Sequence, residues 1–140
     1  MAFLFILVSM KKLLYLFLVV IAGAGCHKAI YDMNRGELKI AKKDTYQVEY
    51  ITEIPPGVKA KMYYIGAKNV QYYEEEYTGK FDKTYTIKSG KEIKFTIDAK
   101  LPKTKPEGSI HTMVKVDGEV VTDQTQSGTD INFRFQFKLP

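Results

Sequence analysis

The chain has 140 residues, of which 45% are hydrophobic and 26% are charged, with one cysteine and two histidines. This length suggests a single domain, and the apolar fraction is too high for a disordered chain. One cysteine excludes an internal disulfide framework and a cysteine-based zinc site, and two histidines exclude a histidine-rich metal site. We therefore expect no metal and no other cofactor.

The first 25 residues have the features of a bacterial export signal. They contain no acidic residue, and Lys11 and Lys12 precede an apolar run over residues 13–21. A membrane-spanning helix needs about 20 apolar residues, so this short run favours a cleaved signal helix over a permanent span. Residues 1–9 fit poorly before the basic pair, which favours Met10 as the true start; a start at Met1 is the alternative.

Cys26 lies directly after the small residues 22–25, where a lipoprotein signal places its acylated cysteine. The segment resembles a bacterial lipobox, and it predicts cleavage between Gly25 and Cys26, although Gly23 replaces the usual branched aliphatic residue. Several acyl chains anchor a protein stably, whereas one chain alone is marginal. We expect Cys26 to be lipidated with palmitate-like chains; the alternative is a free cysteine in an ordinary signal.

The lipid predicts a membrane-anchored protein on the extracytoplasmic side, periplasmic or at the outer membrane in a Gram-negative cell.

Without Lys11 and Lys12 the formal charge falls from +5 to +3. That charge is spread along the chain, so nucleic acid is not an expected partner. Residues 26–44 contain few apolar side chains and are predicted to be a lipid-anchored tether, in which Leu38 and Ile40 are spaced for a short strand.

Residues 45–140 alternate apolar and polar side chains with the period of two that is typical of strands. The alternation is clearest near the end of the chain, where one face carries Ile131, Phe133, Phe135, Phe137 and Leu139. Turn signals separate the runs, and Asp117-Gly118 is the strongest of them because both positions of a tight hairpin need positive φ.

Strands with one solvent-exposed face must bury the other, apolar face against a second sheet. The pattern therefore predicts an all-β fold, an Ig-like antiparallel β-sandwich of seven to eight strands over residues 45–140. A barrel is the alternative, and we expect no helix after the signal.

Three segments of this domain are distinctive: the opening strand 45–50, the segment 60–64, and the segment 109–121 with its Val-Asp-Gly-Glu-Val-Val hairpin. Together they resemble the MmpS family and its Ig-like relatives. The resemblance covers about residues 45–138. It implies an extracytoplasmic accessory module that works beside RND-type exporters. The chain departs from the family in two ways, because it has a lipidation signal in place of an uncleaved helix and lacks a cysteine pair in the last strands.

No residue pattern points to catalysis. Glu74, Glu75 and Glu76 form an acidic cluster, but neighbouring strand residues face opposite sides of a sheet, so we expect a solvated edge. His111 has no neighbouring ligand and is expected to face outward or to be hydrogen-bonded. The chain has no nucleophile elbow and no phosphate-binding glycine loop. We expect that it is not an enzyme.

Tyrosines are denser around residues 63–77 than a sheet core needs. Adjacent tyrosines in a strand place one ring on each face, so some rings are exposed, and Tyr63, Tyr73 and Tyr77 form a candidate binding patch. Cross-strand packing on the sheet surface is the alternative explanation. Two functions follow: a protein-interaction or transport accessory module of an envelope complex or exporter, or a module that binds an envelope glycan or another small ligand through exposed tyrosines.

Overall fold

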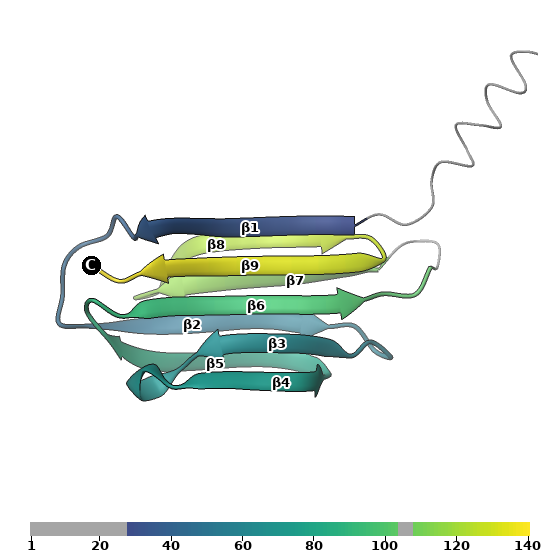
Figure 1. The fold of residues 1–140 in the computed structure, drawn as a ribbon, viewed down its shortest axis with the longest axis horizontal. Helices are drawn as coiled ribbons and strands as arrows, with labels where there is room; N and C mark the ends of the chain where they lie inside the picture. Colours follow the sequence, from purple (N-terminus) through teal and green to yellow (C-terminus); the bar gives the residue numbers. More distant parts are fainter. Residues whose placement is uncertain (1–27, 104–107) are drawn as a thin grey trace, which may run out of the picture.

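The alternating apolar residues form strands throughout the part of the chain that the structure describes, which is residues 28–103 and 108–140 of a computed structural model. Nine strands in these ranges form two packed sheets (Figure 1). The five-stranded sheet consists, in spatial order, of β1 (Lys28–Glu37), β9 (Asp130–Lys138), β6 (Glu92–Lys100), β3 (Ala60–Ile65) and β4 (Gln71–Tyr77). The four-stranded sheet consists of β5 (Gly79–Lys88), β2 (Thr45–Ile54), β7 (Ser109–Val116) and β8 (Glu119–Ser127).

The predicted all-β sandwich is confirmed. The sheets enclose a core in which Phe133 and Phe135 of β9 are fully buried, as the alternation in the last strand predicts. Aromatic rings connect the sheets: Tyr50 of β2 lies 5.0 Å from Phe95 of β6 between ring centroids. Each such buried ring stabilises the fold by about 1.5–3 kcal/mol relative to its exposed state.

A single helical turn, η1 (Ala67–Asn69), connects β3 to β4. Within residues 28–103 and 108–140, no helix is long and apolar enough to cross a membrane. Met10, Gly25 and Cys26, and the signal helix predicted over residues 1–25, lie outside the described residues.

The tether prediction is wrong for residues 28–37, which form β1 and pair in parallel with β9, from Lys28 opposite Asp130 onward. Among the described residues from 45 onward there are eight strands, β2 to β9, within the predicted seven to eight. β1 adds a ninth strand, and its pairing with β9 is parallel. Specific partners stabilise this polar strand. The Tyr31 ring stacks on Phe133 at 5.1 Å, and its hydroxyl is hydrogen-bonded to the Thr122 hydroxyl at 2.7 Å.

Leu38 and Ile40 do not form the short strand expected of them. Leu38 follows β1 and is buried, and its N–H donates to the Lys138 carbonyl at 2.9 Å. The segment then crosses to the four-stranded sheet, where Tyr46 is buried and its hydroxyl accepts a hydrogen bond from the Lys43 N–H. The sandwich therefore includes residues 28–44, and its boundary is not at residue 45.

The chain changes sheets twice near its end. It leaves the five-stranded sheet after β6, forms the β7–β8 hairpin in the other sheet, and returns as β9 beside β6. The hairpin turn is the predicted one, with φ of 50° at Asp117 and 81° at Gly118. The Asp117 carboxylate accepts hydrogen bonds from the Gln47 N–H and from the Lys43 ammonium, both at 2.9 Å. These hydrogen bonds connect the Asp117-Gly118 turn to the start of β2 and to the segment before it.

These two bonds hold the pKa of Asp117 below its ordinary value of 3.8, the Gln47 N–H contributing most. Because the pKa of Asp117 is lower in the folded state than in the unfolded state, its ionised form stabilises the fold at a pH above the unfolded-state pKa. This contribution is lost as the pH falls through the folded-state pKa. We expect Asp117→Asn to lower the free energy of unfolding by about 1 kcal/mol at neutral pH, because the group is partly exposed and loses one charge-assisted bond.

Urea unfolding of both proteins between about pH 7 and pH 2.5 measures this difference. The difference in the free energy of unfolding between wild type and variant should shrink steadily below pH 3.8, as the wild-type Asp117 carboxyl takes up its proton. Asparagine tolerates positive φ, so the turn itself is conserved in the variant. A difference that stays constant down to the lowest pH contradicts the assignment.

Candidate functional site

The side of the five-stranded sheet that faces away from the core, called the outer face below, carries two of the three predicted tyrosines. Tyr63 of β3 lies directly opposite Tyr73 of β4. Their neighbours Met62 and Tyr64 are buried in the core, so alternation turns Tyr63 outward. Tyr73 is 58% exposed, and the ammonium of Lys94 lies 4.7 Å from the centre of the half-buried Tyr63 ring. The structure therefore brings Tyr63 and Tyr73 together on an accessible surface.

Tyr77 does not join them. The pairing of β3 with β4 shifts register between Ala60 and Met62, so that Tyr77 lies opposite the buried Ala60. A bulge of this kind inserts an extra residue and turns the following side chain to the other face. Tyr77 is half-buried, packs edge-to-face on Phe81 at 5.4 Å and donates its hydroxyl to the Lys80 carbonyl. The predicted patch is therefore divided: Tyr63 and Tyr73 share the outer face, and Tyr77 is turned to the other side of the sheet.

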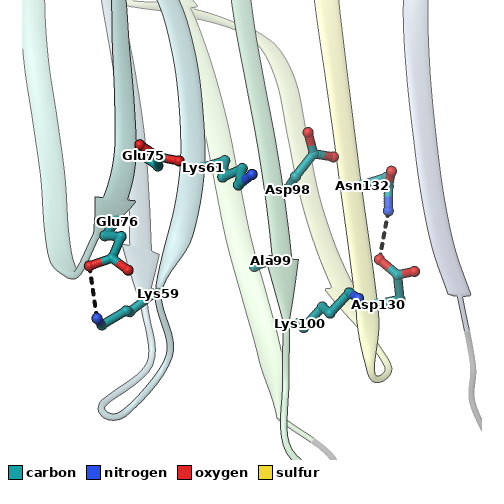
Figure 2. Close-up of a pocket in the computed structure, with 9 residues that line it drawn as sticks. All are labelled: Lys59, Lys61, Glu75, Glu76, Asp98, Ala99, Lys100, Asp130 and Asn132. Atoms are coloured by element: carbon teal, nitrogen blue, oxygen red, sulfur yellow. Dashed lines mark hydrogen bonds and ion pairs between the residues drawn. The ribbon is translucent and has the colours of Figure 1, made fainter.

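A shallow groove of about 510 Å³ lies on the same outer face, at the ends of β4 and β6 and the start of β9 (Figure 2). Figure 2 shows Lys61, Asp98 and Asn132 in a row across three neighbouring strands, and the sheet register pairs them directly. The groove is lined by three lysines, four acidic residues, an asparagine and an alanine: Lys59, Lys61, Lys100, Glu75, Glu76, Asp98, Asp130, Asn132 and Ala99. Its charge is nearly balanced.

Some of these groups are already paired. Lys59 forms an ion pair with Glu76 at 2.8 Å, and Asn132 donates to the Asp130 carboxylate at 2.9 Å. Asp98 accepts two hydrogen bonds from the Arg134 guanidinium, at 2.9 and 3.0 Å. These bonds fix the walls of the groove.

Three charged groups in the groove have no such partner. Among the described residues, the side chains of Lys61, Glu75 and Lys100 make no ion pair or hydrogen bond. Charges of both signs are thus free to contact a polar partner, and the groove does not select a simple anion or a simple cation.

The groove lies at the end of the sandwich where β1 begins. Lys100 lies opposite Asp130, and Asp130 lies opposite Lys28, the first residue of β1. Figure 1 shows this end on the right, where the described chain begins. Only two peptide units separate Lys28 from Cys26, which is at most about 7 Å of extended chain.

Sequence reasoning missed this groove. Its side chains come from β3, β4, β6 and β9 and from Lys59, the residue before β3, so they span much of the sequence. The one signal is that polar residues alternate along β6 and β9 on the face opposite the core. The bulge that displaces Tyr77 also brings Glu75 and Glu76 to the same groove, so the expectation that adjacent carboxylates diverge is wrong for this pair.

The remaining candidates have local explanations. His111 is exposed on β7, as predicted, and its Nε2 is hydrogen-bonded to the Asp123 carboxylate on the neighbouring strand. Within residues 28–103 and 108–140, no three histidine, cysteine or acidic side chains lie close enough to hold a metal ion.

The chain matches no protein-family model, and a search of the curated proteins finds no relative. The assignment of function therefore depends on the geometry of the site and on the features of the leader.

Because Tyr73 faces outward and Tyr77 faces the core side, replacing each by alanine should lower the free energy of unfolding by different amounts. Tyr77→Ala should lower the free energy of unfolding by about 2 kcal/mol, because it removes a half-buried ring from the core. Tyr73→Ala should change it by less than about 0.5 kcal/mol, because the ring is mostly exposed. Urea unfolding measures both, and Tyr77→Phe controls for the hydroxyl. Equal costs for the two alanine variants are incompatible with this placement.

Proposed function

We propose that this protein is a non-catalytic lipoprotein of the bacterial cell envelope that docks a protein partner through the outer face of its five-stranded sheet. Lipid at Cys26 holds it on the extracytoplasmic side of a membrane. The observation that carries the proposal is the exposed Tyr73 paired with the half-buried Tyr63, next to a groove with free charges of both signs.

The leader and the fold together support the anchored part of this proposal. A basic pair, a short apolar run and small residues precede Cys26. Because β1 begins at Lys28, acyl chains on Cys26 hold the sandwich directly against the bilayer, with the groove end closest to it. A membrane-embedded partner is then within reach of the groove.

The chemistry of the outer face supports a protein partner. Tyrosine is enriched among the residues that dominate binding energy at protein interfaces, because it buries a large ring and retains a polar end. Free charges of both signs give register and specificity through complementary pairing. The resemblance of residues 45–138 to the MmpS family supports an exporter or another envelope complex as that partner.

A glycan is the second candidate ligand, and one observation favours it. Asp98, Asp130 and Asn132 present carboxylate and amide groups in the groove, and such groups form hydrogen bonds with sugar hydroxyls. Tyr73 adds an exposed flat ring at the same face. Both candidates use the same surface, so one experiment separates them.

The anchor is tested by growing cells with an alkyne-bearing palmitate analogue and attaching a fluorophore to the purified protein. We expect label on the wild-type chain and none on Cys26→Ser, which should also move from the membrane fraction to the soluble fraction. An unlabelled wild-type chain, or label that survives in the variant, contradicts lipidation at Cys26.

The docking face is tested with the photo-crosslinker benzoylphenylalanine in place of Tyr73. Val120 is the matched control, since it is 53% exposed on the opposite sheet. Irradiation of intact cells should give one discrete protein adduct from position 73 and none from position 120, and Lys61→Glu should weaken it.

Adducts of equal yield from both positions, or none from position 73, contradict docking through the outer face. An adduct at position 73 that stains for carbohydrate and contains no second polypeptide favours the glycan.

A further inference from the structure

A second cavity of about 510 Å³ lies at the opposite end of the sandwich, between the start of β2, the end of β5, η1 and the residue before β6. Three lysines line it, Lys68, Lys88 and Lys91, together with the polar side chains of Thr45, Asn69 and Thr86. No acidic residue lines this cavity, in contrast to the balanced groove on the outer face.

The three lysines are unpaired. Among the described residues, their side chains make no ion pair and no hydrogen bond. Neighbouring ammonium groups repel one another, and an anion placed among them relieves that repulsion and gains charge-assisted hydrogen bonds. The hydroxyl and amide groups of Thr45 and Asn69 supply further donors to such an anion.

The backbone that carries Lys68 is held in an unusual conformation. Lys68 and Asn69 both have positive φ, 56° and 60°, which is uncommon for residues other than glycine and costs energy. Two hydrogen bonds close the loop, from the Gly66 N–H to the Val70 carbonyl and from the Val70 N–H to the Ala67 carbonyl.

Gly66 also fixes the loop by its close packing. A Cβ atom at this position would lie 2.7 Å from the Tyr72 ring and 3.0 Å from the Tyr85 ring. The loop therefore rests on a stack of tyrosines and presents Lys68 from a fixed position. Strained backbone of this kind is often found at sites that hold a ligand.

We propose that this cavity binds the phosphate group of a soluble phosphorylated small molecule, of the size of a sugar phosphate. Lysine is a common phosphate ligand that acts as a point charge, whereas paired recognition of carboxylates favours arginine, which this cavity lacks. The volume is that of a small-molecule site. The exposed hydroxyl and amide groups leave room for a polar body beside the phosphate.

The position of the cavity argues for a soluble ligand over a lipid headgroup, a step that rests on the proposed anchor. The nine residues of β6 run from beside Lys91 to Lys100 in the groove, which is about 30 Å of strand. The groove end carries the start of β1 and so the proposed anchor, and the lysine cavity lies at the end away from it.

The test is isothermal titration of the purified full chain in detergent with glucose 1-phosphate, with inorganic phosphate and with glucose. We expect saturable binding of glucose 1-phosphate that weakens as salt is added, weaker binding of phosphate, and none of glucose. The triple variant Lys68→Gln, Lys88→Gln, Lys91→Gln should bind glucose 1-phosphate at least about tenfold more weakly.

The matched control is Lys80→Gln with Lys83→Gln, two exposed lysines on β5 that do not line the cavity. It should keep the wild-type affinity within about twofold. The substituted side chains are all exposed, so circular dichroism and urea unfolding should match the wild type in every variant. The single substitutions Lys68→Gln and Lys91→Gln should each weaken the binding of glucose 1-phosphate, but by less than the triple variant does.

Three outcomes overturn the proposal. They are the absence of saturable binding by either phosphate probe, an equal loss in the control variant, and lysine-dependent binding of phosphatidylglycerol vesicles without binding of glucose 1-phosphate. The last of these would assign the cavity to a membrane surface. None of them bears on the crosslink at Tyr73, which tests the outer face of the five-stranded sheet.

Discussion

The parallel pairing of β1 with β9 determines how the proposed lipid at Cys26 would hold this molecule. Without it, residues 28–37 are a polar segment with no reason to be ordered, and the sandwich is free to sample any orientation. With it, the first described residue, Lys28, is part of the five-stranded sheet. The stack of Tyr31 on Phe133 and the bond from the Gln126 side chain to the Ala29 carbonyl add side-chain contacts to the ladder. Under the proposed lipidation, acyl chains on Cys26 would therefore hold a rigid body.

In the proposed anchored form, the two ends of the sandwich would have different environments. The end that carries the balanced groove is the end at which β1 begins, and the end that carries the unpaired lysines lies about 30 Å away along β6. Groups near a membrane surface contact lipid headgroups and embedded proteins, whereas groups at the far end contact solutes of the compartment. The two proposed activities, docking and small-molecule binding, would therefore use distinct surfaces of one small domain.

The strands from β2 to β9 are predictable from the sequence because alternation with a period of two is a local signal. Burial of one face then requires a second sheet. The Asp117-Gly118 turn is predictable for the same reason, since its φ angles are local. β1 is not, because its stability comes from Phe133, which is distant in sequence. The same holds for the site: Tyr63 and Tyr73 follow from alternation, but the bulge that turns Tyr77 inward depends on pairing that no local pattern encodes.

Amide hydrogen exchange on the full chain in lipid nanodiscs tests the central claim, that β1 is a strand of the sandwich and not a tether. We predict that the amides of residues 28–37 that point toward β9 exchange slowly and lose protection together with β9 as urea is added, as one cooperative unit. Exchange of residues 28–37 at the rate of an unstructured peptide, with β9 still protected, would show a flexible tether and contradict the account.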